Sequence, residues 1–381
     1  MRFSVDAHAI GQHLTGNETY IRNLLNGFAA HDDESDFIAY VSRASAMAEL
    51  PERFLKRLVA ENPWKRLGFD LPLHLLADRP ALLHVQYTAP LACRVPIVVS
   101  VHDVSFLENP EYFTPFRSLQ LRYTVRRTVL SAARVLTPSE FSKRAIMRAY
   151  GLPDEKITVM PNGVSSAFRP VAREAAARWL ESRYRVPPRF ILSVGDLQPR
   201  KNHAALITAF EQLLRAHPEL PQHLVFVGKL AWRSGEILAA AKASPASGRI
   251  HFMDFVSDEE LTRFYGACDL FVYPSLYEGF GLPIIEAMAC GRAVACSNTT
   301  AMPEVADSAA LLFDPTSIPE QVRAMRDLLL DAELRARMER LGMQRAGIFN
   351  WDRTARETLD VYYEVAGAPR HAPVGTSISV L

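Results

Sequence analysis

Two glutamates, Glu278 and Glu286, frame the segment EGFGLPIIE, whose residue types suit the binding of an anionic ligand. Gly279 and Gly281 leave the backbone bare just before a stretch of helical apolar spacing, so the free N–H groups and dipole of a helix N-terminus can approach a diphosphate. The carboxylates would flank that anion, one beside a sugar and one where it can accept hydrogen bonds from a ribose diol. The segment therefore predicts a site for a nucleoside diphosphate sugar.

A second segment, GDLQPRKN at 195–202, supplies the complementary charge. Gly195 lets the end of a strand close against a ligand, and Arg200 and Lys201 come just before a helix expected to start near Asn202. A guanidinium that chelates phosphate oxygens, next to an ammonium, suits the negative charge that grows on a leaving diphosphate. An Arg-Lys pair by itself is usually an exposed surface pair, but its position after a strand and a glycine favours a binding role.

The elements that must position these residues are visible as short apolar runs that alternate with segments of helical period. The runs cover 3–7, 81–85, 96–103, 134–139 and 157–163, and after Pro170 the pattern begins again at 190–197, 223–230, 249–256, 269–275 and 293–298. Such alternation predicts an α/β fold with two Rossmann-like doubly wound domains. Because ligands bind beyond the carboxyl ends of parallel strands, we expect the site in a cleft between the domains.

We expect the N-terminal domain over 1–170 and the C-terminal domain over 171–350. A helix over 351–366 is expected to pack back on the first domain, and the polar, proline-containing residues 367–381 are expected to form a flexible tail.

The bulk properties narrow the possible functions. The chain has 381 residues, more than one hydrophobic core usually organises, and its net charge of +1 gives no reason to expect a nucleic acid as partner. The four cysteines form no CxxC pair and have no His-rich cluster beside them, which predicts free thiols, a reducing compartment and no metal site. Asp6 and His8 interrupt the apolar core that a signal peptide needs, so we expect a cytoplasmic protein.

The runs at 195–202 and 269–291, together with the pair His102-Asp103, resemble the retaining GT-B glycosyltransferases of family 4, also called group 1. The resemblance covers nearly the whole chain and is nearest to bacterial mannosyltransferases of surface-polysaccharide assembly. It implies that the N-terminal domain binds the acceptor and that the C-terminal domain binds the nucleotide sugar.

The resemblance also implies roles for individual residues. Glu278 would contact the donor sugar and Glu286 the ribose, Arg200 with Lys201 would hold the diphosphate, and His102 would point at the transferred sugar. Further donor contacts are implied at Gly16, Gly195, Phe280, Gly281, Leu282 and Val256.

The N-terminal loop at 9–20 departs from the commoner glycine-rich form, because Asn17 and Glu18 follow Gly16. The acceptor-side candidates are accordingly Asn17, Glu18 and Asp103. A simpler interpretation of His102 and Asp103 is that they end a strand and cap the next turn.

The expected reaction is the metal-independent, retaining transfer of a hexose to a glycan or lipid-linked acceptor, with no cofactor. We expect the sugar to be mannose and the donor GDP-mannose. A UDP-sugar donor (glucose or GlcNAc), a sugar-nucleotide epimerase of the same architecture and a catalytically silent nucleotide-sugar-binding subunit stay open as alternatives. A dinucleotide-dependent oxidoreductase is disfavoured, since neither GQHLTG nor EGFGLP fits G-x-G-x-x-G.

Residues 113–136 have helical spacing and carry five arginines, Arg117, Arg122, Arg126, Arg127 and Arg134. A basic amphipathic helix of this kind can lie on an anionic membrane or bind a lipid-diphosphate acceptor, which would place the protein at the inner face of a membrane. The same pattern also fits an ordinary domain helix whose arginines meet solvent.

Overall fold

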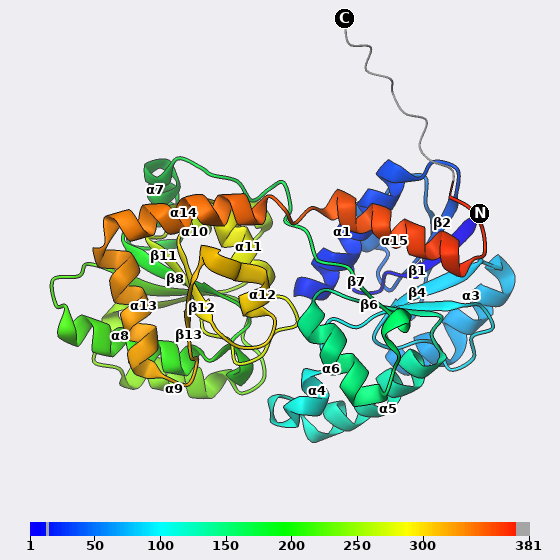
Figure 1. Cartoon of the computed structure of the whole chain (residues 1–381), viewed down its shortest axis with the longest axis horizontal. Helices are drawn as coiled ribbons and strands as arrows, with labels where there is room; N and C mark the ends of the chain where they lie inside the picture. Colours follow the sequence, from blue (N-terminus) through cyan, green and yellow to red (C-terminus); the bar gives the residue numbers. More distant parts are fainter. Residues whose placement is uncertain (13–14, 371–381) are drawn as a thin grey trace, which may run out of the picture.

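The computed structural model describes residues 1–12 and 15–370 and consists of two α/β domains side by side (Figure 1). Residues 13–14, inside the loop at 9–20, and residues 371–381, most of the expected tail, lie outside the described residues. Within the described residues, no helix combines the length and the apolar character needed to cross a membrane.

The N-terminal domain is built on a seven-stranded parallel sheet in the order β3-β2-β1-β4-β5-β6-β7. The strands are β1 (Arg2–Asp6), β2 (Asp36–Val41), β3 (Leu55–Leu58), β4 (Leu82–Gln86), β5 (Ile97–Ser100), β6 (Arg134–Thr137) and β7 (Ile157–Val159). The helices are α1 (Thr15–His31), α2 (Pro63–Lys65), the π-helical turn η2 (Arg66–Asp70), α3 (Leu71–Asp78), α4 (Ser105–Glu108), the 3-10 turn η3 (Pro110–Tyr112), α5 (Pro115–Ser131), α6 (Glu140–Tyr150) and, from the end of the chain, α15 (Trp351–Val365).

The C-terminal domain has a six-stranded parallel sheet in the order β10-β9-β8-β11-β12-β13. Its strands are β8 (Phe190–Val194), β9 (His223–Val227), β10 (Ile250–Met253), β11 (Leu270–Tyr273), β12 (Val294–Ser297) and β13 (Leu311–Phe313). Its helices are α7 (Arg173–Tyr184), α8 (His203–Ala216), α9 (Ser234–Ala243), α10 (Asp258–Ala267), α11 (Leu282–Ala289), α12 (Met302–Ala306), α13 (Ile318–Leu330) and α14 (Ala332–Ala346).

Both sheets reverse their strand order once, and these switch points decide where a ligand can bind. The reversal lies between β1 and β4 in the first sheet and between β8 and β11 in the second. Since the loops at a switch point diverge, they leave a crevice at the carboxyl ends of the strands. The α/β fold with two Rossmann-like domains, predicted from the apolar runs, is thereby confirmed.

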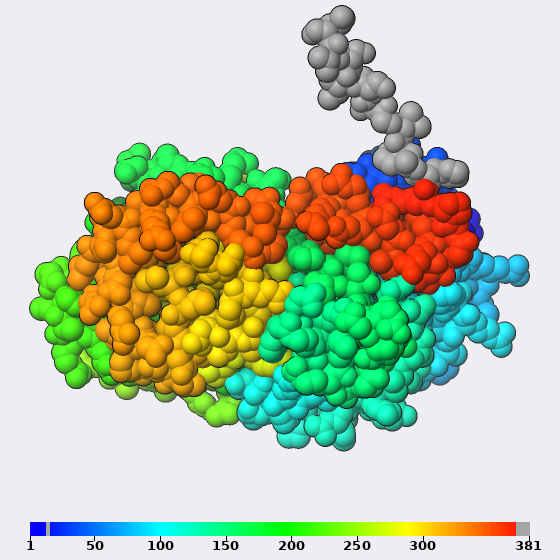
Figure 2. All heavy atoms as spheres, viewed as in Figure 1, coloured from blue at the N-terminus to red at the C-terminus, as the bar shows by residue number. Residues whose placement is uncertain are grey.

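Helices cover both faces of each sheet. In the N-terminal domain α1 and α15 pack on one face, where Tyr362 of α15 meets Phe3 of β1 edge-on with ring centroids 5.3 Å apart. Side chains of α3, α5 and α6 form a separate core on the other face. After α14 the chain therefore returns to the N-terminal domain with α15 (Figure 1 and Figure 2). Where the chain crosses between the domains for the first and the second time, Val164 and Asn350 form a parallel β-bridge.

Local sequence signals explain several of the helix ends. Ser257 and Glu260 form the expected capping box of α10, and Gly291 follows α11 with a φ of 72°, a conformation that favours glycine. The helix expected over 113–136 is shorter: α5 begins after Thr114, whose hydroxyl accepts a hydrogen bond from the Arg117 amide, and Arg134 already belongs to β6. Strands β2, β3 and β13 were not predicted from the sequence.

Candidate active site

Glu278 lies in the loop between β11 and α11 and makes two buried ion pairs. Its carboxylate is 2.7 Å from Nζ of Lys201 and 2.9 Å from Nη1 of Arg200, both in the turn after β8. Nζ of Lys201 also bonds to the Tyr273 hydroxyl at 2.7 Å, and Arg200 donates to the carbonyl of Tyr277 at 2.6 Å. The loops after β8 and β11 thus meet at the switch point of the C-terminal sheet.

Glu278 and Arg200 hold each other ionised, whereas burial lowers the pKa of Lys201 below its ordinary value although the charge of Glu278 acts in the opposite direction. Burial alone would raise the pKa of Glu278, but the charges of Arg200 and Lys201 outweigh it and lower that pKa to about 2. Burial alone would lower the pKa of Arg200, but Glu278 and, from the other domain, Asp103 raise it above its ordinary value. A carboxylate and two cations therefore share one buried site, where an arriving diphosphate would meet fixed positive charge.

Two glycines shape the backbone around the cluster. Gly195, with a φ of 149°, ends β8 under Lys201: a Cβ here would approach Cε of that lysine to 3.1 Å. Gly281, with a φ of 105°, comes immediately before α11, which begins at Leu282. Bulkier residues at these positions would displace the lysine or strain the turn, as expected where the backbone approaches a ligand.

The neighbours of Gly281 serve partly as packing residues. Phe280 is buried and its ring meets that of Phe349 edge-on, with centroids 5.5 Å apart. Leu282 packs against the core of the C-terminal domain and also against that of the N-terminal domain. Val256 is buried in the C-terminal core, so its side chain is not offered to a ligand.

Glu286, the second acid of the segment, is buried on α11 and separate from the ion pairs. It accepts a hydrogen bond of 2.9 Å from the Tyr265 hydroxyl. Burial raises its pKa to about 8, although the bond from Tyr265 acts in the opposite direction. In this state the neutral acid is therefore favoured near pH 7.

His102 follows β5 and is fixed from several sides. Its Nε2 lies 3.0 Å from Oε1 of Gln86, whose amide nitrogen in turn donates to the carbonyl of Asn17 at 3.3 Å. The Tyr20 ring packs against it with centroids 4.7 Å apart, and the Tyr87 ring lies 5.7 Å away. Because the Gln86 oxygen can only accept, Nε2 carries the proton and Nδ1 is the free acceptor.

The imidazole of His102 is neutral near pH 7, since burial lowers its pKa to about 4 in spite of the charge of Asp103. Asp103 itself begins the next turn: its Oδ1 accepts from the amide of Ser105 at 2.9 Å and from the hydroxyl at 2.6 Å. The capping interpretation of Asp103 thus holds, while its charge still acts on Arg200 across the domain boundary.

The two domains touch directly beside these residues. Any Cβ at Gly279 would collide with the backbone carbonyl of His102. The Gly279 carbonyl accepts from the hydroxyls of Ser139 at 2.7 Å and of Ser142 at 3.1 Å, both at the start of α6. The glycine next to Glu278 therefore brings the loop between β11 and α11 against the N-terminal domain, next to His102.

A second set of contacts holds the same boundary closed. Glu304 of α12 accepts hydrogen bonds from the amides of Glu140 and Phe141, at 2.8 and 3.0 Å, and so caps the N-terminus of α6 from the other domain. The Tyr277 hydroxyl donates to Glu108 at 2.8 Å. These contacts join residues that are far apart in the chain, so no local sequence pattern predicts them.

The loop expected at 9–20 is shorter in the structure, because Gly16, Asn17 and Glu18 lie in the first turn of α1, which begins at Thr15. Gly16 is exposed, and a Cβ added there would meet no atom within 4 Å. The Asn17 carbonyl accepts from Gln86, which ties the start of α1 to His102. Glu18 is buried and turns back on the preceding loop, where it accepts from the Gly11 amide at 3.0 Å, and it pairs with Arg22.

Sequence reasoning missed the polar residues that position the predicted ones, namely Tyr265, Tyr273, Gln86, Ser139 and Ser142. Each of them lies in or beside an apolar run, so its side chain is indistinguishable from ordinary packing in the sequence. Ser139 could have been identified as a helix N-cap, since SEFS has the right form, but its bond to Gly279 could not. Across the described ranges, no group of three or more His, Cys, Asp or Glu side chains is placed to hold a metal ion.

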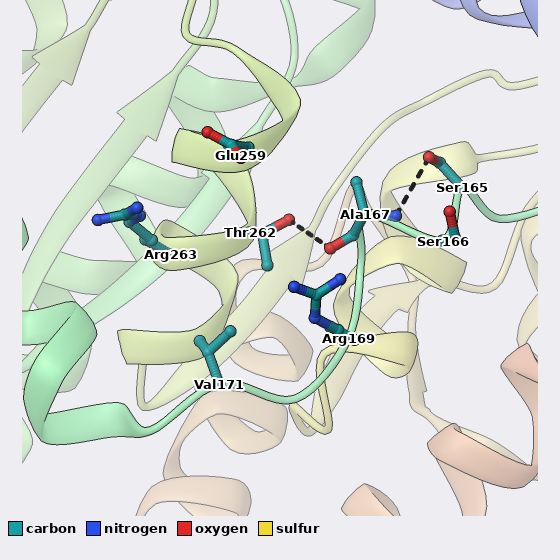
Figure 3. A pocket seen from close by; sticks show the side chains of 8 residues that line it. All are labelled: Ser165, Ser166, Ala167, Arg169, Val171, Glu259, Thr262 and Arg263. Atoms are coloured by element: carbon teal, nitrogen blue, oxygen red, sulfur yellow. Dashed lines mark hydrogen bonds between the residues drawn. The ribbon is translucent and has the colours of Figure 1, made fainter.

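A separate hollow of about 370 Å³ lies between the linker that joins the domains and α10 (Figure 3). Its lining includes Ser165, Arg169 and Arg263, and the Thr262 hydroxyl bridges it to the linker by donating to the Ala167 carbonyl at 3.1 Å. None of the predicted site residues lines it.

Comparison with known proteins agrees with this geometry. Residues 14–168 match the family described as Glycosyltransferase Family 4, and residues 181–345 match Glycosyl transferases group 1. O-antigen chain mannosyltransferase B of Escherichia coli is 32% identical over 265 residues, which cover 70% of this chain and 69% of that protein. The chain belongs to the family 4 glycosyltransferases. Within this family it is also 29% identical to the serotype-specific mannosyltransferase WbdA of Escherichia coli over 73% of this chain, although the match spans only 35% of WbdA.

Solved structures show the same GT-B fold. The Anabaena protein Alr3699/HepE in complex with UDP and glucose superposes with a TM-score of 0.75 at 18% identity, over 96% of this chain and all of that one. The family 4 glycosyltransferase described here thus has the two-domain architecture of its structural neighbours, and its ion-pair cluster lies at the domain boundary.

Proposed function

We propose that this glycosyltransferase transfers a hexose with retention of anomeric configuration from a nucleoside diphosphate sugar to a glycan or lipid-linked acceptor in surface-polysaccharide synthesis. The observation that carries the proposal is the buried cluster of Arg200, Lys201 and Glu278 at the switch point of the C-terminal sheet. Similarity to O-antigen chain mannosyltransferase B supports mannose as the sugar and GDP-mannose as the donor.

In this reaction an acceptor hydroxyl oxygen bonds to the anomeric carbon while the bond from that carbon to the diphosphate breaks. The nucleoside diphosphate leaves with the bonding electron pair, and the hydroxyl proton is released. Arg200 and Lys201 stabilise the negative charge that develops, so the scheme needs neither a metal ion nor a cofactor. Glu278 orients both cations through its ion pairs and favours their charged forms, and in this scheme its carboxylate contacts the donor sugar.

In this scheme His102 and Gly16, in the first turn of α1, complete the donor site from the N-terminal domain. The neutral imidazole of His102 offers a hydrogen-bond acceptor at Nδ1 for a sugar hydroxyl, and Gly16 leaves room for a close approach of the backbone. Glu286 accepts hydrogen bonds from the ribose hydroxyls after it has lost its proton or the hydrogen bond from the Tyr265 hydroxyl. Closure at Gly279 excludes water, which would otherwise hydrolyse the donor.

The acceptor side of the proposal rests on the N-terminal domain. Asn17 and Asp103 are the proposed acceptor-side residues: Asn17 is tied to His102 through Gln86, and Asp103 follows His102 in the chain. Glu18 holds the preceding loop to α1 by accepting from the Gly11 amide. The balanced overall charge gives no support to a nucleic acid partner. A cytoplasmic location, with contact to the inner face of the membrane through 113–136, fits a lipid-linked acceptor.

A donor panel tests this proposal. Thermal unfolding is followed with GDP-mannose, UDP-glucose and UDP-GlcNAc, since a true donor stabilises the fold by mass action. Stabilisation by GDP-mannose, followed by transfer of labelled mannose to polysaccharide acceptor, supports it. Stabilisation by a UDP sugar alone would show that the donor is that UDP sugar and not GDP-mannose. Formation of epimerised donor in the absence of acceptor would indicate an epimerase. If none of the donors stabilised the fold, a catalytically silent subunit would be favoured.

A further inference from the structure

The most exposed large apolar side chains gather in one part of the N-terminal domain. Of the residues that the structure describes, nine such side chains are exposed by 58% or more, and all except Leu230 lie between residues 64 and 123. The eight are Trp64, Phe69, Leu73, Leu76, Leu91, Phe116, Leu119 and Tyr123. Single exposed apolar residues are ordinary, but a concentration of this kind marks an interaction surface.

These side chains come from three segments that form one surface: 63–79 with α2, η2 and α3, the loop 89–96, and 115–131 with α5. The Leu91 amide donates to the Leu67 carbonyl at 3.0 Å, which joins the loop to η2. Arg127 of α5 donates to the Leu91 carbonyl at 3.2 Å, which joins the loop to α5. In Figure 1, α3 lies at the end of the domain remote from the C-terminal domain, and α5 lies along its lower edge.

The inner faces of both helices are already occupied. Leu75 of α3 and Val125 of α5 are buried in the same core on one face of the sheet. Since that core is complete, the outer residues, such as Leu73 and Tyr123, are not needed for folding and have no partner within the described part of the domain core. The exposed face is therefore available to a partner outside the chain.

The charges on this three-segment surface have a single sign. Its exposed charged residues are all basic: Lys65, Arg79, Arg94, Arg117, Arg122 and Arg126. The three segments contain only two acids, and both face the protein. Asp78 is buried in an ion pair with Arg57 at 2.8 Å, and Asp70 accepts the Ala60 amide at 2.7 Å. A patch of this sign stands out on a chain whose net charge is +1.

We propose that the three-segment surface docks the protein on a bilayer that contains anionic lipids. Aromatic and leucine side chains would enter the boundary between headgroups and acyl chains, while the arginines and Lys65 meet the lipid phosphates. This extends the membrane contact expected for 113–136 to α3 and to the loop around Leu91. A protein partner of ordinary composition would match the apolar residues but not the unbroken positive charge.

The position of the surface connects it to the proposed function. A hollow of about 500 Å³ lies between η3 and the first turns of α5, lined by residues that include Phe113, Leu119 and Arg122 and, at the edge of the three-segment surface, the acid Glu111. Glu108, just before η3 in the chain, receives the hydrogen bond from Tyr277 of the C-terminal domain. The docked surface thus borders the domain boundary, and an acceptor anchored in the same bilayer would reach the crevice from this side. This last step rests on the proposed function, whereas bilayer docking does not.

The test is co-sedimentation of the full chain with vesicles of phosphatidylcholine containing phosphatidylglycerol, compared with vesicles of phosphatidylcholine alone. One variant combines Phe69→Gln, Leu73→Gln and Phe116→Gln, and another combines Arg117→Gln, Arg122→Gln and Arg126→Gln. The matched controls are Leu230→Gln, at 65% exposure, and the triple replacement of the exposed Arg323, Arg337 and Arg340 of α13 and α14 by glutamine. Thermal unfolding with and without donor shows that each variant is folded and keeps its donor site.

The expected result is binding to the anionic vesicles that both test variants lose and both controls keep. An arginine near an anionic surface changes the partition constant about fivefold, so the arginine triple should lose about a hundredfold. Absence of binding by the unmodified chain, or equal loss in the controls, would overturn the proposal. A homo-oligomer that the apolar variant dissociates would overturn it in favour of a second copy of the chain. Because neither donor nor acceptor is present in the binding assay, a wrong sugar assignment would leave its outcome unchanged.

Discussion

Replacing Glu278 by glutamine tests the central ion-pair cluster, because it removes a buried negative charge and keeps the side-chain shape. The carboxylate is 7% exposed and neutralises Lys201 at 2.7 Å and Arg200 at 2.9 Å. A buried ion pair that loses one partner costs about 3–5 kcal/mol, since the remaining charge is left uncompensated. For a domain of this size that loss lowers the melting temperature by roughly 6–20 °C.

A bound nucleoside diphosphate should return the missing negative charge. We therefore expect GDP or UDP, whichever matches the donor, to raise the melting temperature of Glu278→Gln by more than it raises that of the unmodified protein. A ligand at a hundred times its Kd adds about 2.7 kcal/mol to the free energy of unfolding. The transfer rate should move in the opposite direction and fall by about a hundredfold, because the oriented carboxylate beside the donor sugar is lost.

The assay is thermal unfolding of both proteins with and without nucleotide, together with transfer of labelled sugar. Glu236→Gln is the matched control: it breaks an exposed pair with Arg233 and should leave the free energy of unfolding almost unchanged. A nucleotide effect that is smaller in Glu278→Gln than in the unmodified protein would refute the assignment of Arg200 and Lys201 to the diphosphate.

Three further predictions address other parts of the site. Gly279→Ala should abolish transfer but keep the stabilisation by donor, because its Cβ would collide with the His102 carbonyl. The control Gly235→Ala, where a Cβ meets no atom within 4 Å, should keep transfer. Full activity in Gly279→Ala would contradict closure at this contact. The pKa of Glu286 is about 8 in the folded protein, whereas the ordinary value is 4.5. Between these two pH values folding binds a proton, so the contribution of Glu286 lowers the free energy of unfolding as the pH rises. Denaturant unfolding between pH 5 and 8 should show Glu286→Gln gaining up to roughly 4 kcal/mol over the parent toward the upper end, and parallel profiles would remove Glu286 as the source. Transfer should survive EDTA, and complete loss that manganese restores would show that a metal ion is required.

The fold was predictable wherever burial on both sheet faces left an apolar run. The ten predicted runs correspond to ten strands of the two sheets, and the edge strands show why others were missed. Strand β3 reads LKRL and has exposed or half-buried residues throughout, so it carries no apolar signal, and β13 has three residues. The interior strand β2, DFIAYV, is buried along most of its length and does carry such an apolar run, so its signal was present in the sequence.

Of the candidate site, only the features that a short sequence segment displays by itself were predictable. Glycines, the helix start at Leu282 and the charged residues of 195–202 and 278–286 are local features that short sequence segments display. Their mutual contacts depend on strand order, because β8 and β11 are neighbours in the sheet although they are far apart in the chain. Lys201 follows β8, Glu278 follows β11, and the two residues are 77 positions apart. Spacing along the chain carries no information on such a pair.

The contacts across the domain boundary explain why donor and acceptor roles are hard to separate in this chain. Glu278 pairs with Arg200 and Lys201 of the C-terminal domain. The carbonyl of its neighbour Gly279 accepts hydrogen bonds from the hydroxyls of Ser139 and Ser142, at the start of α6 in the N-terminal domain. Opening the domains must break those bonds and the cap that Glu304 places on α6, which leaves backbone amides exposed to water. The loop that carries Glu278 is therefore also the loop that joins the domains. If the donor binds at Glu278 as proposed and contacts both domains, it favours the closed state over the open one.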